Sequence, residues 1–161
     1  MNKGLFYKGR GFLILFKIRQ GRRQILFLIF SADRHIIGES VINEIDWQLR
    51  CVNFRICIFR PDIRGKGVGT WATKVTCDFA FEHLKLHRLE LNVFSFNPHA
   101  QRAYLKAGFK KEGILWDAVL DGDQYADDIL MAILEDDWKN KRKQKDKLEF
   151  VGGQNNGIYK T

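Results

Sequence analysis

The chain has 161 residues, 45% of them hydrophobic, and a formal net charge of +8. This length fits one domain of ordinary size, and this hydrophobic content excludes a chain that is disordered throughout. The positive charge is concentrated at the ends, because residues 1–24 carry +7 and residues 139–161 carry +5, whereas residues 25–138 carry −4. Basic ends attract nucleic acid or anionic lipid, although solvated tails have the same composition and are the interpretation we favour.

The apolar runs near the N-terminus predict strands rather than membrane-spanning helices. Phe12–Phe16 and Ile25–Phe30 are far too short to cross a bilayer as helices. A signal peptide is not indicated either, because Lys17 and Arg19 interrupt its apolar core and no small-residue cleavage site follows. We therefore expect a cytoplasmic protein that is not associated with a membrane.

Apolar periodicity predicts six strands after residue 24. Alternation of apolar and polar residues, or a short apolar run, places them at Ile25–Phe30, Ile36–Ile45, Val52–Phe59, Arg88–Phe96, Lys111–Leu120 and Asp127–Leu134. The residues Asp121, Gly122 and Asp123 form the expected turn between the last two strands.

Two helices are predicted between these strands. Apolar residues near helical spacing indicate a long amphipathic helix over Thr70–Leu86. A second helix starts at Asn97 and Pro98, which are good N-cap and first-turn residues, and stops at Gly108. The order of elements predicts one mixed α/β domain over residues 25–138, with an atypical basic segment over 1–24 and a basic tail over 139–161.

The cysteines and two of the histidines give only weak evidence for a metal site. Cys51, Cys57 and Cys77 contain no CxxC pair, and Cys51 and Cys57 on one strand would lie about 20 Å apart. His83 and His87 have zinc-like spacing on the predicted long helix, but no HExxH motif or cysteine cluster accompanies them. We expect reduced thiols and no metal.

The glycine-rich loop between a strand and the long helix predicts an anion site. The first amides of a helix have no partner within it, and the helix dipole is positive at that end. Glycines let the backbone approach a ligand closely, and a pyrophosphate is the natural anion for such a site. Neither a Gly-Lys-Ser/Thr P-loop nor a complete GxGxxG motif is present. The predicted site consists of Arg64, Gly65, Lys66, Gly67, Val68, Gly69 and Thr70.

The loop resembles the Arg/Gln-x-x-Gly-x-Gly/Ala signature of GNAT-superfamily N-acetyltransferases. Later segments continue the family pattern in register, at Leu86–Leu91, Phe96–Pro98, Ala103–Tyr104, Ala107–Phe109, Glu112–Gly113, Asp121–Gly122, Asp128, Met131, Glu135 and Trp138. The chain most closely resembles the branch of ribosomal-protein alanine acetyltransferases and spermidine acetyltransferases. The resemblance implies a mixed, mostly antiparallel sheet flanked by helices.

The resemblance also implies a reaction and residue roles. The family moves an acetyl group from acetyl-CoA to a primary amine, such as a peptide or protein N-terminus, a polyamine or another small amine, by direct attack in a ternary complex. By this resemblance the loop amides hold the CoA pyrophosphate, and the strand ending at Ile58 and Phe59 splays from its neighbour to bond the pantetheine arm. Asn97 helps to hold that arm, and Tyr104 protonates the departing thiolate.

The chain departs from the family at the general base. Some relatives have a catalytic glutamate twelve residues before the tyrosine, where this chain has Asn92, which cannot act as a base. Glu44 and Glu90 are our first candidates, ahead of Glu39 and Asp46. Water, or an amine that is already neutral, is a further alternative.

A second departure concerns the acceptor pocket. Family members have two helices before the central hairpin, whereas the residues before Ile25 contain only a strand-like run at Phe12–Ile18. We expect a pocket that is open, remodelled or completed by a partner chain, for example in a homodimer. Leu115–Trp138 contains eight acidic residues and no basic one, which would attract a cationic amine, or would simply be solvated. Two other functions stay open: a CoA-binding module without a complete acceptor site, and a nucleic-acid-binding protein that uses its basic ends.

Overall fold

One eight-stranded sheet forms the frame of the computed structural model, which describes residues 6–9, 12–18 and 24–153. The strands are β1 Phe6–Gly9, β2 Phe12–Ile18, β3 Ile25–Ser31, β4 Ile36–Asp46, β5 Cys51–Ile58, β6 Arg88–Phe94, β7 Lys110–Asp121 and β8 Gln124–Leu134. Their order in the sheet is β1-β2-β3-β4-β5-β6-β8-β7. Neighbours pair antiparallel except β5 and β6, which are parallel. The expected mixed, mostly antiparallel sheet is confirmed.

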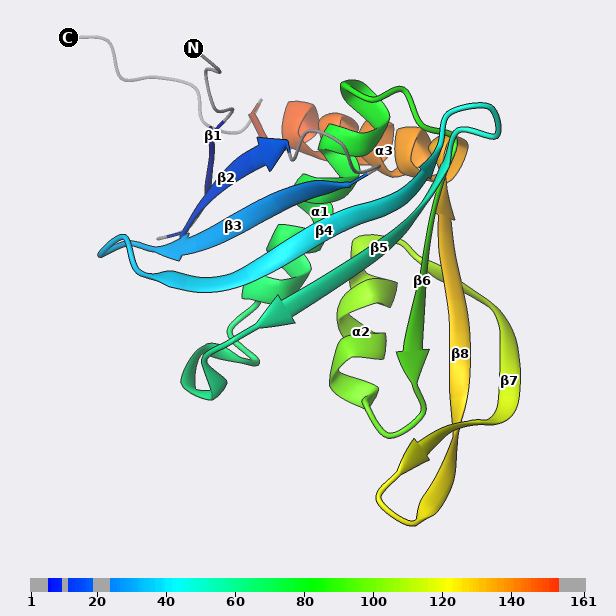
Figure 1. The fold of residues 1–161 in the computed structure, drawn as a ribbon. Helices are drawn as coiled ribbons and strands as arrows, with labels where there is room; N and C mark the ends of the chain where they lie inside the picture. The colour runs from blue at the N-terminus through cyan, green and yellow to red at the C-terminus, as the bar shows by residue number, and fades with distance from the viewer. Residues whose placement is uncertain (1–5, 10–11, 19–23, 154–161) are drawn as a thin grey trace, which may run out of the picture.

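Helices cover only one face of this sheet. They are the short 3-10 helix η1 Pro61–Ile63 and the α-helices α1 Val68–Glu82, α2 Pro98–Ala107 and α3 Glu135–Gly153. In Figure 1, α1, α2 and α3 all lie behind the sheet, and the face toward the viewer has no helix on it. No helix among the described residues is both long and apolar enough to span a membrane.

Strand alternation decides which side chains form the core. In β3, Ile25, Phe27 and Ile29 are buried, whereas the residues between them are partly exposed. In β6 the same alternation buries Leu89 and Leu91 against the helices. Burial of each such side chain contributes about 1.5–3 kcal/mol relative to exposure, so the helix-covered face holds most of the hydrophobic stabilisation.

The predicted strands and the second helix are confirmed to within a few residues. Asn97 caps α2 by accepting a hydrogen bond from the Ala100 amide at 3.2 Å, and Gly108 ends it with φ 118. The run Phe12–Ile18 is the strand β2, and it pairs with β3 along its whole length. Strand β1 was not predicted. The division of the chain at residues 24 and 138 remains a prediction.

The prediction of the long helix was wrong at its C-terminal end. Helix α1 stops at Glu82 instead of Leu86, because Lys85 has φ 55 and the Leu86 amide bonds back to the Ala80 carbonyl. His83 and His87 therefore lie beyond the helix, and they do not share a helical face.

A buried pair of hydroxyl groups joins α1 to the sheet. Ser40 on β4 and Thr76 on α1 are both fully buried, and their oxygens lie 2.8 Å apart. Thr76 also donates to the Ala72 carbonyl at 2.9 Å, so Ser40 is the donor to Thr76. This contact fixes where α1 lies along β4.

We predict that Thr76→Val lowers the free energy of unfolding by about 1–3 kcal/mol, because it leaves the buried Ser40 hydroxyl without an acceptor. Valine has the shape of threonine, so little packing is lost. Urea unfolding should show a lower midpoint with an unchanged m-value. Adding Ser40→Ala to this variant should recover part of the loss. A double variant whose loss equals the sum of the two single losses would contradict the contact.

Candidate functional site

The only parallel pair of the sheet separates after a short contact. β5 and β6 are paired at Cys51–Asn53 and Arg88–Glu90, and beyond those residues they have no ladder with each other. Figure 1 shows the two strands diverging, with α2 behind the space between them. The Phe59 amide donates to the Ile37 carbonyl of β4, so alternation turns the backbone groups of Phe54, Ile56 and Ile58 toward β6. The expected splay is present.

The loop after β5 turns the chain into α1 through two left-handed glycines. Gly65 has φ 77, and Gly67 has φ 85 and is the N-cap of α1. The space around the loop is open, because a Cβ added at Gly65, Gly67 or Gly69 would meet no atom within 4 Å. The amides at the start of α1 therefore face an approach wide enough for a phosphate.

The two basic residues of the loop differ in their contacts. Arg64 turns back to the sheet, where its Nη2 donates to the Ile58 carbonyl at 2.9 Å. Lys66 is exposed and makes no ion pair with a described residue. Arg64 thus holds the end of β5, whereas the Lys66 ammonium is the one free to contact an anion.

Asn97 lies at the start of α2 with part of its side chain unused. Its Oδ1 caps the helix, while its Nδ2 makes no hydrogen bond to any described residue. Gln101 fixes the preceding turn by donating to the carbonyls of Phe94 and Ser95, both at 3.3 Å. An amide N–H that projects from a fixed turn beside the splay can donate to a ligand carbonyl.

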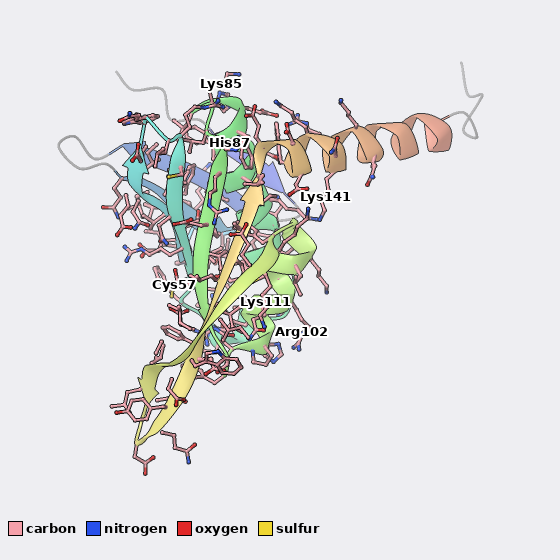
Figure 2. All side chains as sticks on the ribbon, turned by 90° about the vertical axis from the view of Figure 1, so that its right-hand side faces the viewer. Cys57, Lys85, His87, Arg102, Lys111 and Lys141 are labelled. Carbon is pink, nitrogen blue, oxygen red and sulfur yellow. The ribbon has the colours of Figure 1, made fainter. Side chains whose placement is uncertain are left out.

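Tyr104 lies in the core behind the splay. The residue is 7% exposed. Its ring packs edge-on against Phe54, with 6.4 Å between ring centroids, and at a tilt against Phe109, with 5.9 Å between centroids. Burial, together with a smaller effect of the Cys57 thiol, raises the pKa of the Tyr104 phenol to about 12. Cys57 is exposed on the sheet face that the helices leave open, as Figure 2 shows.

The Tyr104 hydroxyl makes no hydrogen bond within the described part of the chain. The residue is buried, but its hydroxyl oxygen is not among the buried side-chain atoms that lack a partner, so the oxygen keeps contact with solvent. The hydroxyl is therefore available to donate to an atom placed between β5 and β6.

The two predicted base candidates lie at the end where β5 and β6 are still paired. Glu44 is exposed, with φ 55, in the β4 bulge between Asn43 and Asp46. Glu90 accepts from the Arg88 Nε at 2.8 Å, and Arg88 also binds Glu112 at 2.6 Å. The Arg88 guanidinium holds the pKa of Glu112 below its usual value. Neither carboxylate contacts Tyr104, and Glu90 is already engaged.

Cross-strand pairing reveals a polar contact that the sequence did not indicate. Asn92 on β6 donates to Asp128 Oδ2 on β8 at 2.7 Å. The other oxygen, Asp128 Oδ1, is buried and has no partner. Asp128 matched the family pattern by itself, but residues that are distant in sequence give no signal of lying side by side.

The described cysteines and histidines do not gather into a cluster. Cys51, Cys57 and Cys77 are free thiols. His83 packs on the Phe79 ring at 5.2 Å, and His87 lies 4.0 Å from Glu135. No three His, Cys, Asp or Glu side chains among the described residues are arranged to hold a metal.

Comparisons with known proteins agree with this geometry. A family model described as an acetyltransferase (GNAT) domain matches residues 7–110. Over 115 residues the chain is 31% identical to a spermidine N(1)-acetyltransferase of Vibrio cholerae, which covers 71% of this chain and 66% of that protein. The chain therefore spans slightly less than two thirds of that relative's length.

Solved structures show the same fold. Spermidine N-acetyltransferase from Vibrio cholerae in complex with CoA and spermine matches with a TM-score of 0.69 and 29% identity, over 74% of this chain and 70% of that chain. A dodecameric structure of the same enzyme matches with a TM-score of 0.70 and 30% identity, over 75% and 70%. The resemblance to spermidine acetyltransferases is confirmed.

We predict that Tyr104 makes stability fall at high pH. The unfolded phenol ionises near pH 10, whereas the native phenol keeps its proton to about pH 12. Between these values the unfolded state binds fewer protons, so the free energy of unfolding decreases as pH rises, by about 2–3 kcal/mol. Below pH 10 the contribution is fully present. Denaturant unfolding of wild type and Tyr104→Phe should therefore differ by a pH-dependent amount between pH 10 and 12. The exposed Tyr125→Phe is the control, and a parallel pH dependence in all three proteins would contradict the assignment.

Proposed function

The chain belongs to the GNAT acetyltransferase family, and on that premise we propose that it is an acetyl-CoA-dependent N-acetyltransferase that acts on a primary amine. The observation that carries this proposal is the splay of β5 from β6 beside the open N-terminus of α1. An extended amide chain can bond the free strand edge while its pyrophosphate lies on the helix amides. These two features match the pyrophosphate and the pantetheine arm of acetyl-CoA.

The proposed cosubstrate site uses the loop Arg64–Thr70 for the pyrophosphate. Backbone amides at the start of α1 and the Lys66 ammonium neutralise the phosphates. The edge of β5 that ends at Ile58 and Phe59 bonds the pantetheine arm, and the free Nδ2 of Asn97 donates to a carbonyl of that arm. Acetyl-CoA bound in this way lies on the helix side, with its thioester between the strands near Tyr104.

The proposed chemistry is a direct transfer in a ternary complex. A neutral amine attacks the acetyl carbonyl, a tetrahedral oxyanion forms, and it collapses as the C–S bond breaks. Donors aimed at the oxyanion stabilise it. The departing sulfur takes a hydrogen bond, and then a proton, from Tyr104.

Burial of Tyr104 has two opposing effects on this role. A pKa of about 12 keeps the phenol protonated at every working pH, so the donor is always present. The same pKa makes it a weaker acid than a free thiol, whose value is about 8.5. Tyr104 is therefore best suited to donate a hydrogen bond to the sulfur while its negative charge develops. The proton that it passes to the sulfur is replaced by the one that the attacking nitrogen loses as the tetrahedral intermediate collapses.

The candidate bases for removing the amine proton before attack are Glu44, Glu90 and water. Glu44 is exposed and free to accept a proton, but it lies where β5 and β6 are paired. Glu90 would first have to release Arg88. These contacts favour water, or an amine that arrives neutral, over both glutamates.

The acceptor we propose is cationic. The segment 115–138 carries eight acidic residues and no basic one, so it attracts positive charge toward the β7–β8 hairpin. The spermine complex of the Vibrio cholerae enzyme shows that one similar protein takes a polycation. Polyamines and basic peptide N-termini are the acceptors of first choice.

We also propose that the chain self-associates, with a homodimer as the simplest form. The β7–β8 hairpin projects beyond the rest of the molecule (Figures 1 and 2) and carries exposed apolar side chains. They are Leu115, Trp116, Leu120 and Tyr125, which are 48–77% exposed. Aromatic side chains of this kind are enriched in the cores of interfaces, and a similar enzyme is dodecameric.

We further propose a cytoplasmic location without membrane association, which fits a soluble cosubstrate.

We predict that acetyl-CoA stabilises the protein by about 2.7 kcal/mol at a hundredfold excess over its dissociation constant, because it binds the native state alone. Gly69→Val should abolish most of this gain, since its side chain occupies the open space in front of the α1 amides. Thermal unfolding with and without acetyl-CoA measures both effects. A melting temperature that ignores acetyl-CoA would refute the proposed function.

A matched pair of variants separates ligand binding from backbone strain in that experiment. Gly67 and Gly122 have φ 85 and 66, and an added Cβ meets nothing at either position. Gly67→Ala and Gly122→Ala therefore introduce similar strain, but only Gly67 lies in the proposed phosphate site. Gly67→Ala should weaken acetyl-CoA binding, and Gly122→Ala should leave it unchanged.

We predict that Tyr104→Phe lowers kcat at least tenfold, because general acids of this kind contribute about 10²–10⁴-fold. Phenylalanine keeps the ring and its contacts with Phe54 and Phe109, so acetyl-CoA affinity should not change. Turnover is measured with polyamines, small amines and peptide N-termini at saturating concentration, and Tyr125→Phe is the control. Wild-type turnover by Tyr104→Phe would leave the hydroxyl without a chemical role.

A further inference from the structure

The buried oxygen of Asp128 lacks the donor that such an atom requires. Asp128 Oδ2 is bonded by Asn92 Nδ2 at 2.7 Å, but Oδ1 is buried and bonds to nothing. No ion pair among the described side chains includes Asp128. A carboxylate oxygen without a donor costs more than a neutral group, so an atom in this state calls for a partner from outside the chain.

Asp128 lies on the face of the sheet that the helices leave open. Val93 and Ile129 are paired across β6 and β8 and are buried in the core under the helices. Their neighbours Asn92 and Asp128 therefore project to the other face. Asn92 is on β6, the strand that borders the splay. With the cosubstrate on the helix side and its thioester between the strands, an acceptor approaches the thioester from this open face.

The side chains around Asp128 are apolar and exposed. Asp128 is opposite Phe94 on β6 and opposite Leu115 on β7, and Leu130 follows on the same face of β8. Their exposed fractions are 40%, 48% and 36%. Exposed side chains change rotamer easily, so they can open a path to Oδ1, and they offer contacts to methylene groups.

From this arrangement we propose that Asp128, held by Asn92, binds an ammonium group of an alkyl polyamine acceptor, while Phe94, Leu115 and Leu130 contact its methylene chain. The inference rests on the proposed acetyltransferase function, because it assigns the acceptor's distal charge to this site. An ammonium supplies both the donor that Oδ1 lacks and the charge that a carboxylate prefers. Phe94 adds an aromatic face, which attracts the same cation. Asp128 then selects acceptors with a second positive charge.

The test is the affinity of the full chain for spermidine, measured by titration calorimetry with and without CoA. Asp128→Asn keeps the shape and removes the charge, and it should weaken spermidine binding at least tenfold. Asp123→Asn, in the exposed hairpin turn, removes the same charge elsewhere and should change affinity less than about twofold. Asn92→Ala keeps the charge of Asp128 but removes the hydrogen bond that holds it, and it should weaken spermidine binding about threefold to tenfold. Melting temperatures of all variants verify that they fold. If Asp128→Asn does not fold, the spermidine affinities of Asn92→Ala and Asp123→Asn are compared instead. Weaker binding by Asn92→Ala alone then supports the proposal, and equal affinities contradict it.

Equal spermidine affinity in wild type and Asp128→Asn would overturn the proposal, and so would a wild type that does not bind spermidine. The proposed enzyme function fails in a different way. If spermidine binding depends on Asp128 but no amine is acetylated, the site stands and the acetyltransferase assignment falls. If amines are acetylated while Asp128→Asn binds spermidine normally, the acetyltransferase assignment stands and the proposed Asp128 site falls.

Discussion

The structure depends on one short parallel contact. Three residue pairs join β5 to β6 before the two strands separate. Every other neighbouring pair in the sheet is antiparallel, so this is where a strand edge becomes free in the middle of a sheet rather than at its border. A free edge inside a sheet leaves backbone donors and acceptors without partners, which is costly unless a ligand completes them. Helix α2, which carries Tyr104, lies behind that space (Figure 1), and Arg64 anchors the end of β5.

The two faces of the sheet divide the proposed reaction between them. On the helix side, the glycine loop and the α1 dipole favour the negative charge of a pyrophosphate. On the open face, Asp128 and the acidic hairpin favour the positive charge of an amine. The thioester carbon, placed between the strands, is the point where the two approaches meet.

Burial serves stability and chemistry at the same residue. Packing the Tyr104 ring against Phe54 and Phe109 contributes to the core, and it also raises the pKa of the phenol to about 12. On the open face, the Glu90 carboxylate accepts from Arg88, and the Asp128 carboxylate accepts from Asn92 through one oxygen while its other oxygen is free. Asn92, at a position where some relatives have a glutamate, thus donates through its amide to a carboxylate of the neighbouring strand β8.

Most of the fold was determined by local sequence signals. Period-two alternation placed the strands from β3 onward, Asn97 and Gly108 bounded α2, and the glycines of Arg64–Thr70 placed an open loop before α1, because each of these signals acts through neighbouring residues. The end of α1 was missed, since the left-handed backbone of Lys85 and the bond from the Leu86 amide to the Ala80 carbonyl stop it at Glu82. The length of the β5–β6 contact, the engagement of Glu90 by Arg88 and the pairing of Asn92 with Asp128 were decided by the tertiary structure alone. Strand register joins residues that are far apart in the chain, and the sequence of one strand does not state which residue of another will lie opposite it.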